Sequence, residues 1–123
     1  SKGAVYLYFP SKEAMLNALV EQSAGALART VEQHVAQSAA VDPEAALRGL
    51  LRILFTAVSS PDISAAPRLV LTEAQRFPEL AIFYREHVLD VMRRSMGALL
   101  AAAVGTGLFR ELDIHAFLPL IHI

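Results

Sequence analysis

In this chain of 123 residues, two histidines are the residues whose type and spacing best suit a metal site. His115 and His122 are seven residues apart, so a helix would place them on one face, where they could share a metal ion. No paired carboxylate accompanies them, and the sequence has no cysteine. The zinc-protease pattern HExxH, the glycine-rich phosphate loop and the nucleophile elbow do not occur either. The sequence therefore predicts no enzyme, no metal site and no cofactor.

The opening residues, SKGAVYLYFPSK, carry a second kind of chemistry. They contain both lysines of the chain and no acid, whereas the rest of the chain has nine arginines against 12 acids. Tyr6 and Tyr8 can donate phenolic hydrogen bonds to phosphate oxygens. Lys12 stands at the expected start of a helix, whose free amide groups also favour phosphate. Charge alone leaves open the alternative that this is only a solvated chain end.

The composition predicts one helical folding unit. Apolar residues make up 54% of the chain and aromatic residues only 7%, and alanine and leucine dominate. The absence of cysteine fits a reducing cytoplasm, where we expect the protein. The longest nearly uncharged apolar run, residues 95–109, is shorter than the roughly 20 residues that a membrane span needs. We therefore expect no membrane association, and no signal peptide is visible.

Capping signals divide the first half of the sequence into helices. Pro10 ends an opening helix, and Ser11 then caps a helix that runs to about Ser38. Asp42-Pro43-Glu44 is a second start, because it combines a cap, a proline at the first helical position and an early acid. The helix that follows carries an apolar stripe, formed by Leu47, Leu50, Leu51, Leu54, Phe55 and Val58. We predict that this whole stripe lies in the core.

Ser60-Pro61-Asp62 repeats the start signal, but a further proline follows it closely. Pro67 predicts a short turn and then a helix over about residues 68–76, which Pro78 closes.

A second long helix is predicted from Glu79 to about Val104. It has one apolar face with Leu80, Phe83, Tyr84 and Val91 and another with Ile82, Leu89, Met96 and Leu100. A helix with two apolar faces packs against two neighbours, of which one is expected to be a second copy of the chain. Gly105 and Gly107 end it. Asp113 starts a final helix with a kink at Pro119, and we expect both ends of the sequence to be cut within helices.

The opening stretch SKGAVYLYFPSKEAML resembles the end of the helix-turn-helix region of the TetR (tetracycline repressor) family of bacterial transcription regulators. The family's signature there is a hydroxyl residue, a glycine, a tyrosine, an aromatic residue or histidine, a phenylalanine, and a lysine that opens the next helix. The matching residues are Ser1, Gly3, Tyr6, Tyr8, Phe9 and Lys12. Tyr8 departs slightly, because histidine is commoner at that position. The segments LTEAQRFPELAIFYREHV and GTGLFRELD are similar to parts of the family's more variable regulatory domain.

The resemblance implies an all-α fold in three parts. Residues 1–12 would be the remnant of the DNA-binding domain, residues 13–38 a connecting helix, and residues 39–123 a ligand-binding and dimerisation domain. It also implies contacts with operator DNA for Ser1, Lys2, Gly3, Ala4, Tyr6, Tyr8 and Lys12. Lys2 and Ala4 would face bases, whereas Phe9 is better explained as a packing residue. The helices that would support the recognition helix precede Ser1, so we expect operator binding from the full-length protein only.

The family places an effector pocket inside the regulatory helices and a dimer interface at the C-terminal helices. The resemblance implies a small hydrophobic or aromatic effector among Leu27, Val31, Leu54, Phe55, Glu73, Arg76, Phe77, Tyr84 and His87. Glu73, Arg76 and His87 would be the polar anchors, and a purely structural role is the alternative for each. The homodimer interface would include Leu100, Val104, Leu118 and Ile121, unless these are ordinary core residues. The sequence thus predicts a bacterial repressor that an effector releases from its operator. A helical ligand-binding or dimerisation module without a DNA role is the alternative.

Overall fold

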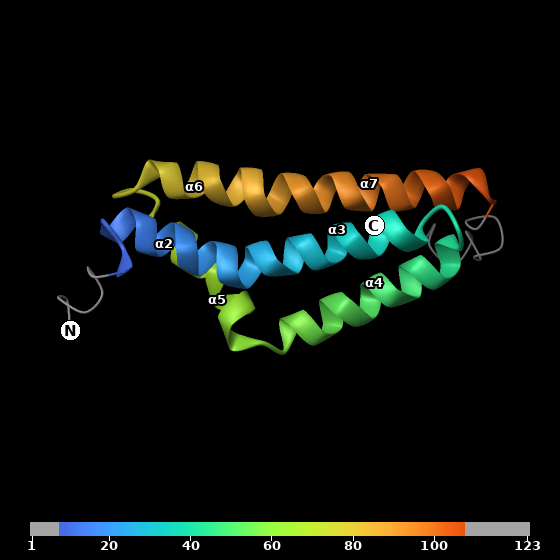
Figure 1. Ribbon diagram of the computed structural model, residues 1–123, viewed down its shortest axis with the longest axis horizontal. Coiled ribbons are helices and arrows are strands. Elements are labelled where there is room, and N and C mark those ends of the chain that lie inside the picture. The colour runs from blue at the N-terminus through green and yellow to red at the C-terminus, as the bar shows by residue number, and fades with distance from the viewer. Residues whose placement is uncertain (1–7, 108–123) are drawn as a thin grey trace, which may run out of the picture.

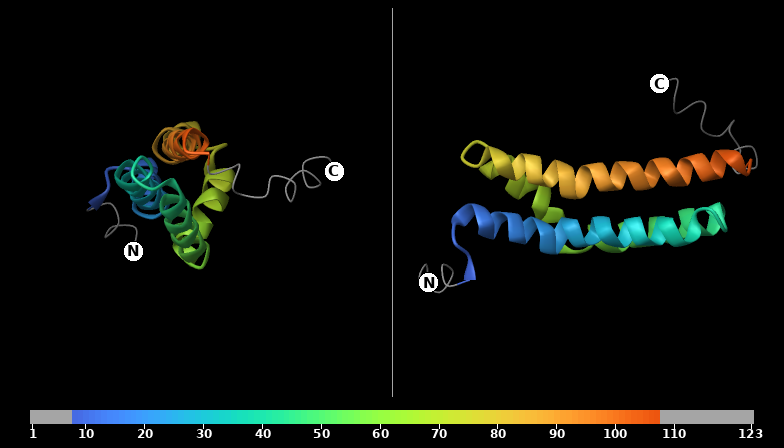
Figure 2. Two further views of the ribbon diagram at one scale, coloured as in Figure 1. Left: turned by 90° about the vertical axis from the view of Figure 1, so that its right-hand side faces the viewer. Right: turned by 45° about the horizontal axis from the view of Figure 1, so that its top comes forward.

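In the computed structural model, which describes residues 8–107, two long helical rods lie side by side (Figures 1 and 2). The first rod comprises α2 (Lys12–Val20), the π-helical turn η1 (Glu21–Gly25) and α3 (Ala26–Ser38). The second comprises α6 (Pro78–Tyr84), the π-helical turn η2 (Arg85–Leu89) and α7 (Asp90–Gly105). Between them in sequence come α4 (Pro43–Val58) and α5 (Pro61–Glu73). The described range contains helices and turns only, which confirms the predicted all-α fold.

The predicted side-chain caps form at the starts of α2 and α4, whereas Ser60 precedes α5 without a side-chain hydrogen bond. The Ser11 side chain accepts a hydrogen bond from the Ala14 backbone N–H at 3.1 Å, so α2 begins with a satisfied donor. Asp42 does the same for α4, since its Oδ1 accepts from the Ala45 N–H at 3.1 Å. At the other end of the molecule α7 ends at Gly105, and Gly107 has a φ of 76°, the left-handed conformation that glycine adopts without steric cost. The predicted helix from Asp113 lies outside the described residues.

The prediction that Pro67 breaks the chain is wrong. α5 is one helix from Pro61 to Glu73 with Pro67 inside it, and it ends before Arg76. A proline within a helix removes one backbone donor, and its ring crowds the carbonyl four residues earlier, here that of Ile63. The Pro67 ring is exposed, so the neighbouring helices do not have to accommodate it.

Two apolar clusters hold the rods together. The first joins α2, η1, α5, α6 and η2, and its buried residues are Leu16, Val20, Ala24, Ala66, Val70, Leu80 and Val88. The second joins α3, α4 and α7, and its buried residues are Val31, Val35, Ala39, Ala46, Leu50 and Leu99. Met92 packs against both clusters, so one side chain bridges the two halves of the core.

The stripe on α4 is only partly core, which corrects the sequence prediction. Leu50 is buried and Leu47 and Leu54 pack against the second cluster, but Leu51, Phe55 and Val58 are 58%, 79% and 76% exposed. Each helical residue turns the side chain by about 100°, so Leu51 already points well away from the face centred on Leu50. The apolar arc of α4 is therefore wider than the face that α3, α5 and α7 cover.

Candidate functional site

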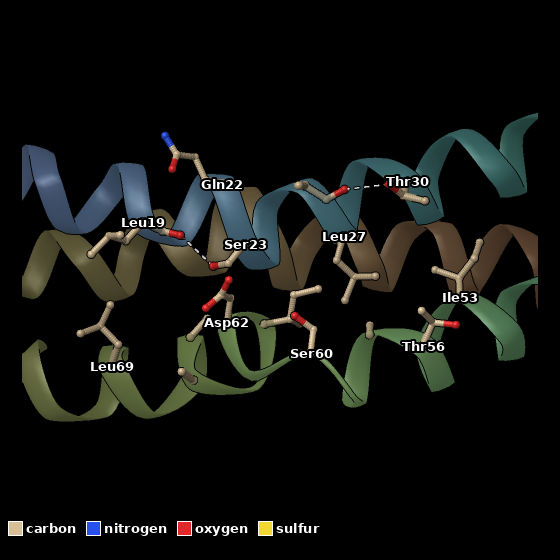
Figure 3. Close-up of a pocket in the computed structure, with 15 residues that line it drawn as sticks. Leu19, Gln22, Ser23, Leu27, Thr30, Ile53, Thr56, Ser60, Asp62 and Leu69 are labelled. Carbon is tan, nitrogen blue, oxygen red and sulfur yellow. Dashed lines mark hydrogen bonds between the residues drawn. The ribbon is translucent and has the colours of Figure 1, made fainter.

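A groove of about 780 Å³ separates the first rod from the C-terminal end of α4 and from α5 (Figure 3). The apolar residues that line the groove are leucines, isoleucines and alanines: Leu19, Ala26, Leu27, Ile53, Ala57, Ile63, Ala65, Ala66 and Leu69. The polar residues that line it are Gln22, Ser23, Thr30, Thr56, Ser60 and Asp62. Leu19, Thr30, Thr56 and Asp62 are exposed, so the groove opens to solvent. A concave site with an apolar body and a few polar groups is what a small-molecule site requires.

Two hydroxyl groups of the groove have their protons committed to their own helix. Ser23 Oγ donates to the Leu19 carbonyl at 2.7 Å, and Thr30 Oγ1 donates to the Ala26 carbonyl at 3.0 Å; both bonds are drawn in Figure 3. A hydroxyl carries one proton and two acceptor lone pairs. Ser23 and Thr30 can therefore act toward a ligand only as acceptors while these bonds persist.

Asp62 supplies the single charged side chain among the described residues of the wall. It stands in the first turn of α5, and Figure 3 shows its carboxylate directed across the groove toward Ser23. Within residues 8–107, no lysine, arginine or histidine forms an ion pair with it.

The π-helical turn η1 forms part of the groove and also faces the second rod. Gln22 and Ser23 line the groove from η1, while η1 contacts η2 on its other side.

Glu21 of η1 forms an ion pair with Arg29, and its Oε2 lies 3.7 Å from Nδ1 of His87 in η2. That distance exceeds a hydrogen bond, and Oε2 is a buried atom without a hydrogen-bond partner among the described residues. His87 in turn stacks on Phe83, with ring centroids 4.0 Å apart. π-turns inside α-helices occur frequently at functional sites.

A second link ties the start of the first rod to the end of α5. Lys12 Nζ lies 3.8 Å from Glu73 Oε2 and 5.7 Å from the centroid of the Phe77 ring. The Lys12 side chain remains 42% exposed, so its ammonium group also reaches solvent.

The structure places one of the predicted effector residues, Leu27, in the wall of the groove. Val31, Leu54, Phe77 and Tyr84 belong to or pack against the apolar clusters. The remaining four lie elsewhere: Phe55 and Arg76 are exposed, Glu73 faces Lys12, and His87 faces Glu21 and Phe83. An effector role for all nine residues, Leu27 included, stays a prediction.

Most of the groove was not predicted from the sequence, although one signal was available. Leu19, Ser23, Ala26, Leu27 and Thr30 recur at helical spacing, so one face of the first rod alternates aliphatic and hydroxyl side chains. The opposite wall, from Ile53 to Leu69, gave no such signal, because the mistaken break at Pro67 divided it.

Of the predicted DNA-binding residues, Tyr8 and Lys12 lie within the described range, and Tyr8 is 82% exposed. Ser1, Lys2, Gly3, Ala4 and Tyr6 lie outside it, as do Leu118 and Ile121 of the predicted dimer interface. Leu100 and Val104 are 51% and 65% exposed on α7. Both DNA binding and dimerisation through these residues stay predictions.

The helices of residues 8–107 include none that is long and apolar enough to cross a membrane. The same part of the chain contains no group of three or more side chains placed to hold a metal ion.

Comparison with known proteins identifies the fold family. A family model described as the C-terminal domain of AefR-like transcriptional repressors, a TetR type, matches residues 45–116. No curated protein and no solved structure matches the chain. The matched segment includes α5, α6, η2 and α7 and most of α4, the elements that build one wall of the groove and the second rod. Because this match spans more than half of the chain, the chain belongs to the TetR family of transcriptional regulators.

Proposed function

We propose that this chain is the effector-responsive part of a repressor that leaves its operator when a small molecule binds in the groove. One observation carries the proposal: the groove is walled by the same helical rod whose N-terminal end follows the helix-turn-helix-like motif. Leu19 and Ser23 of that rod line the groove, and Lys12 lies at its start. A ligand that favours one position of the rod over another therefore changes the population of DNA-competent molecules.

The contacts around the rod support a path from the groove to the DNA-binding end. α5 provides Asp62, Ile63 and Leu69 to the groove, and its last residue, Glu73, faces Lys12. A ligand that displaces α5 or the rod changes the Lys12–Glu73 separation. Lys12 is also one of the residues that we propose to hold the phosphate backbone, together with Tyr6 and Tyr8.

We further propose that the protein acts as a cytoplasmic homodimer. The exposed Leu100 and Val104 on α7 support this, since an apolar helix face that the chain's own neighbours leave open is suited to a second copy.

The test starts with the full-length natural protein. DNA that it retains from a random library is sequenced, and the enriched sequence is used in binding titrations. We expect nanomolar, sequence-dependent binding from the full-length protein and none from residues 1–123 alone. A small-molecule set of mixed charge is then screened for compounds that raise the melting temperature, and these are tested for release of the operator.

Two neighbouring variants locate the effector. Ala65→Phe places a ring in the groove, whereas Ser64→Phe places one on the exposed side of the same helix. We expect Ala65→Phe to abolish release and Ser64→Phe to preserve it. Equal release from both variants would contradict the groove as the effector site. Ligand binding without any enriched DNA would instead favour the alternative, a ligand-binding or dimerisation module without a DNA role.

A further inference from the structure

Three polar side chains of the groove offer acceptors only, beside Gln22, Thr56 and Ser60, which can also donate. Ser23 and Thr30 offer lone pairs only, because their protons are donated to the Leu19 and Ala26 carbonyls. The Asp62 carboxylate is also an acceptor and has no donor proton in its ionised form. A ligand therefore satisfies these three side chains best by bringing donors of its own.

The charge of the groove points in the same direction. Asp62 is negative and directed into the groove, and none of the described wall residues is positively charged. An anionic ligand would leave its charge beside a carboxylate without a compensating cation. A cationic ligand gains an attraction instead, moderated because Asp62 is exposed and solvent screens the interaction.

The apolar surface specifies the rest of the ligand. Leu19, Leu27, Ile53, Ile63 and Leu69 are aliphatic, and the described wall includes no aromatic ring. An aromatic ligand would therefore find no ring to stack on among these residues. An aliphatic ligand would gain binding free energy by burying its apolar surface against them.

We propose that the groove selects amphiphiles with an aliphatic body and a cationic, hydrogen-bond-donating head such as a primary ammonium group. This deepens the proposed function, and rests on it, by naming the chemical class of the effector. The ammonium group lies at Asp62 and Ser23, and the aliphatic body extends along the leucine and isoleucine side chains.

The test compares three probes of one chain length: octylammonium and octanoate, each below its micelle concentration, and octan-1-ol, below its solubility limit. NMR titrations of the chain at pH 7 and low salt follow the amide signals of Ser23, Thr30 and Ile53, which line the groove. These signals separate binding in the groove from adsorption on the exposed residues Leu51 and Phe55 of α4. We expect octylammonium to bind roughly tenfold more tightly than octanoate, with octan-1-ol between them.

A matched pair of variants assigns the selectivity. Asp62→Asn removes the charge from the groove, and Glu79→Gln removes an equivalent charge from the first turn of α6, which does not line it. Both acids follow a proline at the start of a helix, so both variants lose a similar interaction with the helix dipole. We expect Asp62→Asn to reduce the tenfold preference to about two- or threefold and Glu79→Gln to leave it unchanged.

Each remaining outcome is decisive. Octanoate binding at least as tightly as octylammonium would overturn the cationic assignment while leaving the groove as a ligand site. A preference that Asp62→Asn and Glu79→Gln reduce equally would overturn the role of Asp62. If none of the three probes shifts the groove signals, the assignment fails together with the proposal that the groove binds small amphiphilic effectors.

Discussion

At the scale of single residues, His34 connects α3 to α4 by a specific contact. Its Nε2 lies 2.8 Å from the Ala46 carbonyl oxygen, which can only accept, so this nitrogen carries a proton. The imidazole ring lies over Gly49, where a Cβ atom would stand 2.6 Å from Nε2. Gly49 is therefore a position of close approach, and its lack of a side chain lets the hydrogen bond form.

Replacing Gly49 with alanine tests this contact. An added methyl group raises helix propensity but forces His34 away from the Ala46 carbonyl, and we expect a net loss of about 1 kcal/mol in the free energy of unfolding. Gly97 is the matched control, because it lies within α7 and a Cβ atom added there would meet open space. Gly97→Ala should stabilise the chain by about 0.5–1 kcal/mol. Urea denaturation measures both, and equal stabilisation by the two variants would show that His34 moves aside freely.

Tyr84 makes the free energy of unfolding decrease at alkaline pH. Burial raises the pKa of Tyr84 above its ordinary value of 10.0, because the phenolate is poorly solvated against the first cluster. The folded chain thus keeps the phenol proton where the unfolded chain releases it. The resulting stabilisation is complete below pH 10 and is lost as the pH rises through the folded-state pKa.

We therefore expect the urea midpoint to fall as the pH is raised above about 10, and to fall less in Tyr84→Phe. Tyr8→Phe is the control, because Tyr8 is 82% exposed. If Tyr84→Phe and Tyr8→Phe follow the natural chain equally, Tyr84 does not contribute to the alkaline loss.

At the scale of helices, α5 contains two prolines, Pro61 at its start and Pro67 in its interior, with different effects on helix stability. Pro61 stands at the first helical position, where its missing N–H has no partner to lose, whereas Pro67 lies in the interior. Pro67→Ala restores a backbone donor to the Ile63 carbonyl, but it also raises the conformational entropy of the unfolded chain. We expect a net stabilisation of about 1–2 kcal/mol. Pro61→Ala should change stability by less than about 0.5 kcal/mol or lower it. Thermal and urea unfolding measure both, and a destabilised Pro67→Ala would contradict this account.

The same helices show how far the sequence predicts the fold. Ser11, Asp42 and Gly107 act locally, through neighbours three residues away, so their roles could be predicted from the sequence. The exposure of Leu51 and Phe55 depends on which helices lie beside α4, and the sequence contains no local signal of that. The assembly of the groove was not predicted for the same reason, since Ser23 and Asp62 come to line one groove only after α5 folds against the first rod.

At the scale of the whole molecule, the two apolar clusters lie one after the other along the rods. The first holds the end at which α2 begins, and the second holds the end with α4 and the exposed face of α7. The proposed effector groove and the proposed dimer interface therefore lie in different parts of one bundle.

Dimerisation through α7 is tested by charge insertion. Leu100→Arg places a cation in the proposed interface, which is costly when buried without a partner, and we expect it to convert a dimer to a monomer. Leu71→Arg on α5 is the control, because Leu71 is more exposed than Leu100 and lies outside the proposed interface. Sedimentation velocity should show dimers for the natural chain and Leu71→Arg only. A dimeric Leu100→Arg would place the interface elsewhere.

The two π-turns also bear on how the length of this bundle can change. A hydrogen bond from residue i to i+5 encloses one residue more than the α-helical bond from i to i+4, so η1 and η2 each hold one surplus residue. Because η1 and η2 touch, the surplus lies at the same level in both rods. Loss of a single codon in each segment would convert both turns to regular helix, so the bundle can lose one residue from both rods at the same level while the helices beyond keep their mutual alignment.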